Sequence, residues 1–293
     1  MFSPLILIVF LAHEGVTQPG VWRAWQRAMA DHFEIRYHII CPDKPHYGKS
    51  FCNTFRLTRM GPTAWGSFSV VYETIRALCQ LRSDYSQEDW KKVSRLFIVS
   101  GYDIPIHDLR AFDITKDDRE IIGKIALPSA GKFAHLQWMC ITPQLVNHLY
   151  DRYHKQDLFI LKLFHECLGM LKTYPDLAPD EIWLNFVGVD ARRFSARHIL
   201  LPFFHDSSRP ISPITWKDLH LKEYVQQGPI GLRFNLLQAI FLSRREEICF
   251  FRKVHTRVHF PPKLLKMLFD KDIPTPIVHL YRTDLPLNVP QIT

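Results

Sequence analysis

The chain has 293 residues, of which 47% are hydrophobic and 23% charged, and its formal net charge is +8. This composition excludes an intrinsically disordered chain and suffices for one large α/β domain or two small ones. The basic balance favours anionic partners such as nucleic acid, nucleotide-sugars or a membrane surface. Because no long Lys/Arg tract is present, nucleotide phosphate fits at least as well as a nucleic-acid backbone.

The cysteines and the first apolar segment indicate the compartment. The six cysteines are widely spread, with no C-x-x-C pair, which indicates neither a zinc site nor a disulfide framework. Residues 5–11 are apolar but lack a basic region before them and a small-residue cleavage site after them, and they are too short to span a bilayer. We therefore expect a cytoplasmic protein without stable membrane insertion.

The first half of the chain alternates predicted strands and helices. Residues 5–12 and 35–40 are apolar runs typical of buried strands, and residues 21–33 between them have helical spacing. This β-α-β order predicts a parallel sheet. After a polar loop, the predicted elements are, in chain order, a helix over about 69–81 capped by Ser67 or Ser69, a polar helical segment within 84–93, and a buried strand at 96–100.

The second half contains a predicted helix start at Ala178–Glu181. Pro179 suits the first turn of a helix, and the two carboxylates after it would meet the positive end of the helix dipole. The other predicted elements are strands at 121–127, 135–141, 214–216 and 248–251, and helices at 142–153 (capped by Thr142), 157–173, 236–242 and 263–269. No internal repeat or clear linker interrupts them, which favours one domain.

Several catalytic motifs are absent from the sequence. Without G-x-G-x-x-G or G-x-x-x-x-G-K-[ST], a Rossmann dehydrogenase and a P-loop NTPase are disfavoured, and without G-x-S-x-G so is a serine hydrolase. His255 and His259 lack an H-E-x-x-H context, which favours structural histidines over a metal site. No D-x-D motif follows an apolar strand. If the protein handles a nucleotide diphosphate, Arg or Lys must therefore replace the metal.

Six segments, in the same order over about residues 5–254, together resemble a known enzyme family. They are Leu7–His13, Trp65–Val71 (W-G-x-x-S-x-V), Phe97–Ile106 (strand-S-G-x-D-x-P-I), Gln137-Trp138 followed by Ile141-Thr142, Pro179-Asp180-Glu181, and Phe250–Val254 (similar to F-A-R-K-F). In this order they resemble the Core-2/I-branching glycosyltransferase family, which also contains peptide O-xylosyltransferases. The absence of an anchor suggests a compact member, as would suit a bacterium or a large DNA virus.

The resemblance implies a fold and an activity. The fold would be GT-A, an α/β fold with a mostly parallel central sheet flanked by helices. The activity would be inverting, metal-independent transfer from a UDP-sugar, with no cofactor. Xylose is favoured as the sugar, then N-acetylglucosamine, and glucuronate is also used within the family. The partners would be the UDP-sugar and a glycan or glycoprotein acceptor. Residues 1–130 would form the nucleotide-binding half, 131–260 the acceptor and catalytic half, and 261–293 a surface tail.

The resemblance also assigns the reacting groups. Glu181 becomes the general base that takes a proton from the acceptor hydroxyl. Lys253, with its neighbour Arg252, matches the family's cation that stabilises the leaving diphosphate. Arg209 lies nine positions before an Asp-Leu pair and fits the second family cation, with Arg233 as its rival.

The remaining candidate residues would bind nucleotide, sugar or acceptor. His13, Glu14 and Gly15 follow the first strand, where the base and ribose should sit, and Asp43 is expected to replace the aspartate that follows the family's second strand. Asp103, Gln137, Trp138 and Asp180 are the candidates for the sugar and acceptor. Three alternatives stay open: Asp103 caps the turn before Pro105, Trp138 belongs to the core, and Asp180 caps its helix rather than orienting Glu181, the cap being favoured.

A hypothesis from another class is a non-catalytic, basic nucleic-acid-binding protein. The net charge of +8 and the 13% of aromatic residues would suit it. It predicts salt-sensitive binding to oligonucleotides and no turnover of a UDP-sugar.

Overall fold

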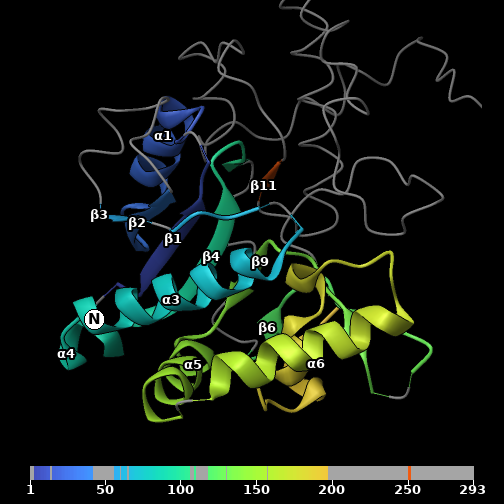
Figure 1. The fold of residues 1–293 in the computed structure, drawn as a ribbon. Coiled ribbons are helices and arrows are strands. Elements are labelled where there is room, and N and C mark those ends of the chain that lie inside the picture. The colour runs from blue at the N-terminus through green and yellow to red at the C-terminus, as the bar shows by residue number, and fades with distance from the viewer. Residues whose placement is uncertain are drawn as a thin grey trace, which may run out of the picture.

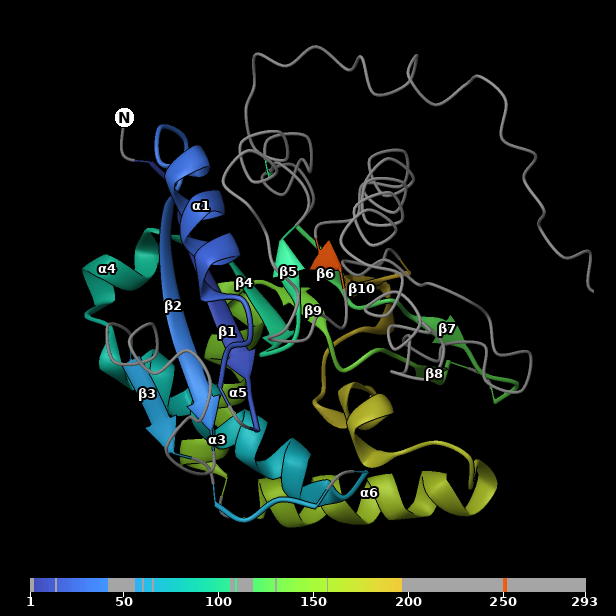
Figure 2. The ribbon, with the colours of Figure 1, turned by 90° about the horizontal axis from the view of Figure 1, so that it is seen from above.

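A central sheet covered by helices on both faces organises the computed structural model (Figures 1 and 2). The structure describes residues 3–13, 15–41, 56–59, 61–64, 66–105, 109, 118–129, 131–156, 158–196 and 250–251. The strand order in the sheet is β10-β6-β9-β4-β1-β2-β3. These strands are β1 (Leu5–Leu11), β2 (Glu34–Cys41), β3 (Arg56–Arg59), β4 (Val93–Ser100), β6 (Glu120–Ile121), β9 (Met139–Ile141) and β10 (Phe194–Ser195).

The sheet is mostly parallel. β1 pairs in parallel with both β2 and β4, and β2 pairs in parallel with β3. β9 runs antiparallel to β4 and β6, while β10 is parallel to β6. The two smaller sheets pair β5 (Ile104–Pro105) with β11 (Phe250–Phe251) and β7 (Ile125–Ala126) with β8 (Phe133–Ala134), both antiparallel. The prediction of an α/β fold with a mostly parallel central sheet flanked by helices is confirmed.

β1 separates two hydrophobic cores. Its even-numbered residues, from Ile6 to Phe10, belong to a core with α1 (Pro19–Met29), which lies along β1 and β2 in Figure 2. Its odd-numbered residues, from Leu5 to Val9, belong to a core with α3 (Phe68–Asp84), α5 (Pro143–Lys155) and α6 (Phe159–Thr173). A strand buried on both faces has no polar side to present, and this is why residues 5–11 form a continuous apolar run.

Two predicted helix caps are present. The Ser67 side chain accepts a hydrogen bond from the Ser69 amide (3.3 Å) at the start of α3. The Thr142 side chain accepts one from the Leu145 amide (3.2 Å) at the start of α5. The buried Glu120 carboxylate supports the second cap, because it accepts from both the Thr142 amide and hydroxyl at 2.6 Å. The predicted polar helix within 84–93 is α4 (Gln87–Lys91).

Two predicted strands are shorter in the structure. The strand predicted at 121–127 is divided into β6 and β7 by Gly123, whose φ of 63° lies in the left-handed region that a strand does not use. The strand predicted at 135–141 begins only at Met139. The two residues at its predicted start hydrogen-bond elsewhere, since the His135 amide donates to the Glu181 carbonyl (2.8 Å) and the Leu136 amide to the Ile122 carbonyl (3.0 Å).

The predicted α-helix at Ala178–Glu181 is wrong in type. The structure has short 3₁₀ turns there, η1 (Pro179–Glu181) and η2 (Trp183–Phe186), followed by η3 (Ala191–Arg193). Ile182, Trp183 and Leu184, which join the first two turns, are all buried. Ile182, with φ −136° and ψ −14°, takes the backbone out of the helical region between the first two turns.

Other predictions lie outside the described residues or remain untested. The elements predicted at 214–216, 236–242 and 263–269 are outside the described parts of the chain, as are residues 248–249 of the last predicted strand. Within those parts, no helix combines the length and apolarity needed to cross a membrane. The compartment and the division into functional halves stay predictions.

Candidate active site

Three parallel strands end at one edge of the sheet, here called the carboxyl edge. β1 ends at Leu11, β2 at Cys41 and β4 at Ser100 (Figure 2). β9 runs the other way, and its first residue, Met139, pairs with Ile98 near the end of β4. The segments that follow β1 and β4 and the segment that precedes β9 therefore share this edge. Open α/β sheets bind their ligands at such an edge.

The loops after β1 and β4 are packed directly against each other. The Thr17 amide and hydroxyl both donate to the Gly101 carbonyl, at 2.8 and 3.2 Å. Gly15 has a φ of 108°, and a Cβ at Gly101 would overlap the Gly15 carbonyl oxygen. Glycine at position 101 thus permits the close approach of two backbones. The exposed His13 is also tied to this region, since its carbonyl accepts a hydrogen bond from the Cys41 thiol (3.3 Å).

Asp103 stabilises the turn that follows β4. Its side chain is fully buried, and Oδ2 accepts a hydrogen bond from the Ser100 amide (2.7 Å). The Asp103 amide donates to the Ser100 carbonyl (3.0 Å), and the Asp103 carbonyl accepts from Trp22 Nε1 (3.0 Å). The turn-capping interpretation of Asp103 matches these contacts, whereas a role toward sugar or acceptor stays a prediction.

The Phe250–Phe251 strand lies beside the same turn. Phe250 pairs with Pro105 and Phe251 with Ile104, although about 145 residues separate the partners in the chain. The buried Phe250 ring is stacked on Trp22 at 5.6 Å and meets Phe97 edge-on at 5.3 Å. The first two residues of the segment similar to F-A-R-K-F are therefore anchored next to the segment similar to S-G-x-D-x-P.

The Pro179–Glu181 turn is attached to the segment that leads into β9. Its Glu181 carbonyl accepts the His135 amide (2.8 Å), two residues before Gln137. The Glu181 side chain is half-buried, and its Oε2 accepts a hydrogen bond from the Ala178 amide (2.9 Å). The cap expected of Asp180, which is itself buried, is thus made by Glu181. At the third position of the turn, the longer glutamate side chain can reach back to the amide before the turn.

His135 is a buried polar residue behind this turn and is not among the residues that the sequence motifs predicted for the site. Its Nδ1 donates to the Leu136 carbonyl (2.9 Å), and its Nε2 accepts from the Leu184 amide (3.5 Å). Burial lowers the pKa of His135 to about 4, so the ring is neutral near pH 7. The only sequence signal for such a role is a histidine at the start of an apolar run.

Gln137 and Trp138 differ in exposure. Trp138 is only 6% exposed and belongs to the core on the α1 side of the sheet, which fits the core interpretation. Gln137 is half-buried and keeps part of its surface at the carboxyl edge. The structure thus brings the segments of His13, Gly15, Asp103, Gln137, Asp180 and Glu181 toward one edge.

The other candidates lie outside the described residues. They are Glu14, Asp43, Arg209, Arg233, Arg252 and Lys253. Arg252 and Lys253 directly follow β11 in the chain. In the described parts of the chain, no group of three or more His, Cys, Asp or Glu residues is placed to hold a metal ion. The expectation of a metal-independent reaction stays a prediction.

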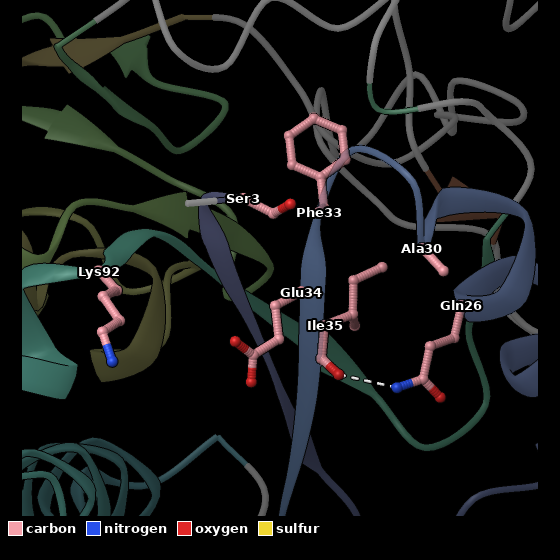
Figure 3. A pocket seen from close by; sticks show the side chains of 7 residues that line it. All are labelled: Ser3, Gln26, Ala30, Phe33, Glu34, Ile35 and Lys92. Carbon is pink, nitrogen blue, oxygen red and sulfur yellow. Dashed lines mark hydrogen bonds between the residues drawn. The ribbon is translucent and has the colours of Figure 1, made fainter. Parts of the chain in front are cut away.

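A pocket of about 450 Å³ lies at the opposite edge, by the amino ends of β1, β2 and β4 (Figure 3). It is lined by Ser3, Gln26, Ala30, Phe33, Glu34, Ile35 and Lys92. Its polar groups have partners of their own, because Gln26 donates to the Ile35 carbonyl (2.8 Å), Glu34 pairs with Arg36 (2.6 Å) and Lys92 pairs with Asp89 (2.8 Å). None of the candidate site residues lines this pocket.

Comparisons with known proteins show a likeness to solved structures. No protein family model matches the chain, and no curated protein sequence is similar to it. Among solved structures, the galactosyltransferase LgtC in complex with donor and acceptor sugar analogues is similar over 67% of this chain and 75% of its own, with 13% identity and a TM-score of 0.38.

Proposed function

We propose that the protein is a glycosyltransferase that moves a sugar from a UDP-sugar to a hydroxyl of a glycan acceptor, with inversion and without a metal. One observation supports it most. Motif segments that begin at His13 and end at Phe251 converge on the carboxyl edge, through the Thr17–Gly101 hydrogen bonds, the β5–β11 pairing and the His135–Glu181 hydrogen bond. Xylose is the favoured donor sugar, followed by N-acetylglucosamine, because the F-x-R-K and S-G-x-D-x-P forms resemble the xylosyltransferase branch of the family more closely.

Glu181 is the proposed general base. A base must be held in a fixed direction and within hydrogen-bond reach of the proton it takes. The hydrogen bond from the Ala178 amide to Oε2 (2.9 Å) fixes the direction of the carboxylate, and the His135–Glu181 backbone bond fixes the turn that carries it. The acceptor hydroxyl, once deprotonated, attacks the anomeric carbon as UDP leaves on the opposite side.

Lys253 and Arg252 are proposed to stabilise the leaving diphosphate. Lys253 follows Phe251 of β11 by two residues in the chain. β11 in turn pairs with the turn that contains Asp103. Fixed cations at that place would stabilise charge that develops on the diphosphate in the transition state. Arg209 is proposed as the second cation from the resemblance alone.

Thermal unfolding with nucleotides tests the donor class. A ligand that binds the folded state raises its apparent stability. UDP is expected to raise the Tm more than GDP, CDP or NAD, and EDTA should not change this. Stabilisation by oligonucleotides but not by UDP would instead favour a nucleic-acid-binding protein. If EDTA abolishes sugar transfer, the diphosphate roles of Lys253, Arg252 and Arg209 are wrong.

Glu181→Gln tests the base separately from the fold. The amide oxygen of glutamine can still accept the hydrogen bond from Ala178, so folding and UDP binding should persist. Loss of general-base catalysis is expected to lower turnover about 10²–10⁴-fold. Glu166→Gln, on the exposed surface of α6, is the matched control and should retain full turnover. Turnover by the Glu181→Gln protein within a few-fold of the unmodified protein would refute the assignment.

A further inference from the structure

α6 presents an apolar surface that no other described element covers. Among the described residues, the exposed large hydrophobic side chains are Leu158 (68% exposed), Leu161 (51%) and Leu168 (41%), and all three lie in or directly before α6. The buried side of the helix, which includes Leu163 and Cys167, packs into the core shared with α3 and α5. In Figures 1 and 2 α6 lies on the outside of the helical layer. Exposed apolar surface concentrated on one helix is typical of an interaction site.

The leucines share one face with His165 and Lys172. Leu161 and Leu168 are seven residues apart, which is two helical turns. His165 follows Leu161 by four residues and Lys172 follows Leu168 by four, so both lie in the same row. Both are exposed. This face, defined by Leu158, Leu161, His165, Leu168 and Lys172, is called the α6 leucine face below.

The charges around the α6 leucine face are mainly basic. The exposed Lys162 follows Leu158 by four residues and therefore borders this face. The exposed Glu166 follows Lys162 by four and lies farther from the face, about 140° from Leu161 around the helix. The whole chain carries a formal net charge of +8. A stripe of leucines bordered by lysines, on a basic protein, is complementary to a surface that has an apolar interior and negatively charged outer groups.

The size of the face argues against a second copy of the chain as the partner. The 15 residues of α6 make a helix about 22 Å long and 10 Å wide, so its outer face covers about 220 Å². A stable protein dimer buries about 800 Å² on each partner. Two copies of a basic chain would also repel each other. A bilayer surface needs no such area, because shallow insertion of a few apolar side chains adds to attraction between lysines and anionic lipids.

We propose that the α6 leucine face attaches the protein reversibly to an anionic lipid surface. The helix would lie in the interface, with its leucines among the upper acyl chains and Lys162 and Lys172 at the headgroups. This mode of binding lies on the membrane and does not span it. It does not depend on the proposed transferase activity.

Co-sedimentation of the full chain with lipid vesicles tests this proposal. Vesicles of phosphatidylcholine with phosphatidylserine are expected to bind the protein, and phosphatidylcholine alone should bind it much less. Replacing Leu161 and Leu168 together by serine should lower the partition coefficient at least about tenfold. Lys172→Glu should lower it about fivefold or more. The matched control is Lys91→Glu on α4, which makes the same change of charge at an exposed site away from α6 and should lower it less than about twofold.

Three results would overturn the proposal. The first is the absence of binding to anionic vesicles at low salt. The second is equal loss of binding in the Lys91→Glu and Lys172→Glu proteins, which would indicate attraction by net charge alone. The third is a dimer, seen by sedimentation velocity, that the Leu161/Leu168 double replacement dissociates, which would make a second copy the partner. Unchanged thermal melting of the double variant shows that a loss of binding is not a loss of fold.

Discussion

Replacing Gly101 by alanine tests whether the loops after β1 and β4 are packed as the structure describes. A Cβ at this position would overlap the Gly15 carbonyl oxygen and lie 3.1 Å from the Ala12 Cβ. Neither neighbour can rotate away, so one loop must move. Overpacking of this kind costs about 1–3 kcal/mol, and weakening of the Thr17–Gly101 hydrogen bonds adds about 0.5–1.5 kcal/mol. Alanine also stabilises the folded state by about 0.4–1 kcal/mol, because it lowers the conformational entropy of the unfolded chain relative to glycine. We expect a net loss of about 1–3 kcal/mol.

Gly169→Ala is the matched control for this replacement. Gly169 lies in α6, and a Cβ there would meet no atom within 4 Å. Alanine in a helix interior should therefore raise stability by about 0.5–1 kcal/mol. The assay is urea unfolding of both variants, followed by UDP binding to the folded Gly101→Ala protein, which should be weaker. A Gly101→Ala protein within about 0.5 kcal/mol of the unmodified chain would refute the described loop packing.

Three further predictions test other contacts of the candidate site. Glu181→Ala should lower the free energy of unfolding, measured in urea, by about 0.5–2 kcal/mol, because it removes the acceptor for the Ala178 amide. Equal stability of the Glu181→Ala and Glu181→Gln proteins would contradict that hydrogen bond. His135 keeps its pKa near 4 in the folded protein and near 6.5 when unfolded, so the unfolded state takes up the proton first and stability should fall, by about 3 kcal/mol in all, as the pH drops from 6.5 to 4. Burial raises the pKa of Glu120, which has the opposite effect on stability as the pH falls. The measurement therefore compares the free energy of unfolding in urea of His135→Asn and of the unmodified chain across that pH range. If the two proteins show parallel pH dependence, His135 is not buried as described. Phe250→Ala should lower the free energy of unfolding by about 3–5 kcal/mol, because Phe250 is fully buried. The control, Phe250→Leu, should lose less stability and keep more of the affinity for UDP. If the folded alanine variant binds UDP as tightly as the unmodified protein, β11 does not position the diphosphate cations.

Local sequence determined the parts of the fold that depend on neighbours in the chain. The apolar runs that became β1, β2 and β4 predicted a buried parallel sheet, since a strand covered on both faces has no polar side. Ser67 and Thr142 could be recognised as caps because a cap acts on amides two or three residues away.

Only the tertiary structure decided how the candidate site is assembled. No pattern near residue 135 indicates that its amide binds the Glu181 carbonyl, and none near Phe250 indicates that it pairs with Pro105. The contact of Glu181 with the Ala178 amide also depends on the 3₁₀ turn at Pro179–Glu181, which the local pattern did not predict. Periodicity and capping report the local environment of each segment, whereas pairing between distant segments depends on which buried surfaces fit together once the chain has closed.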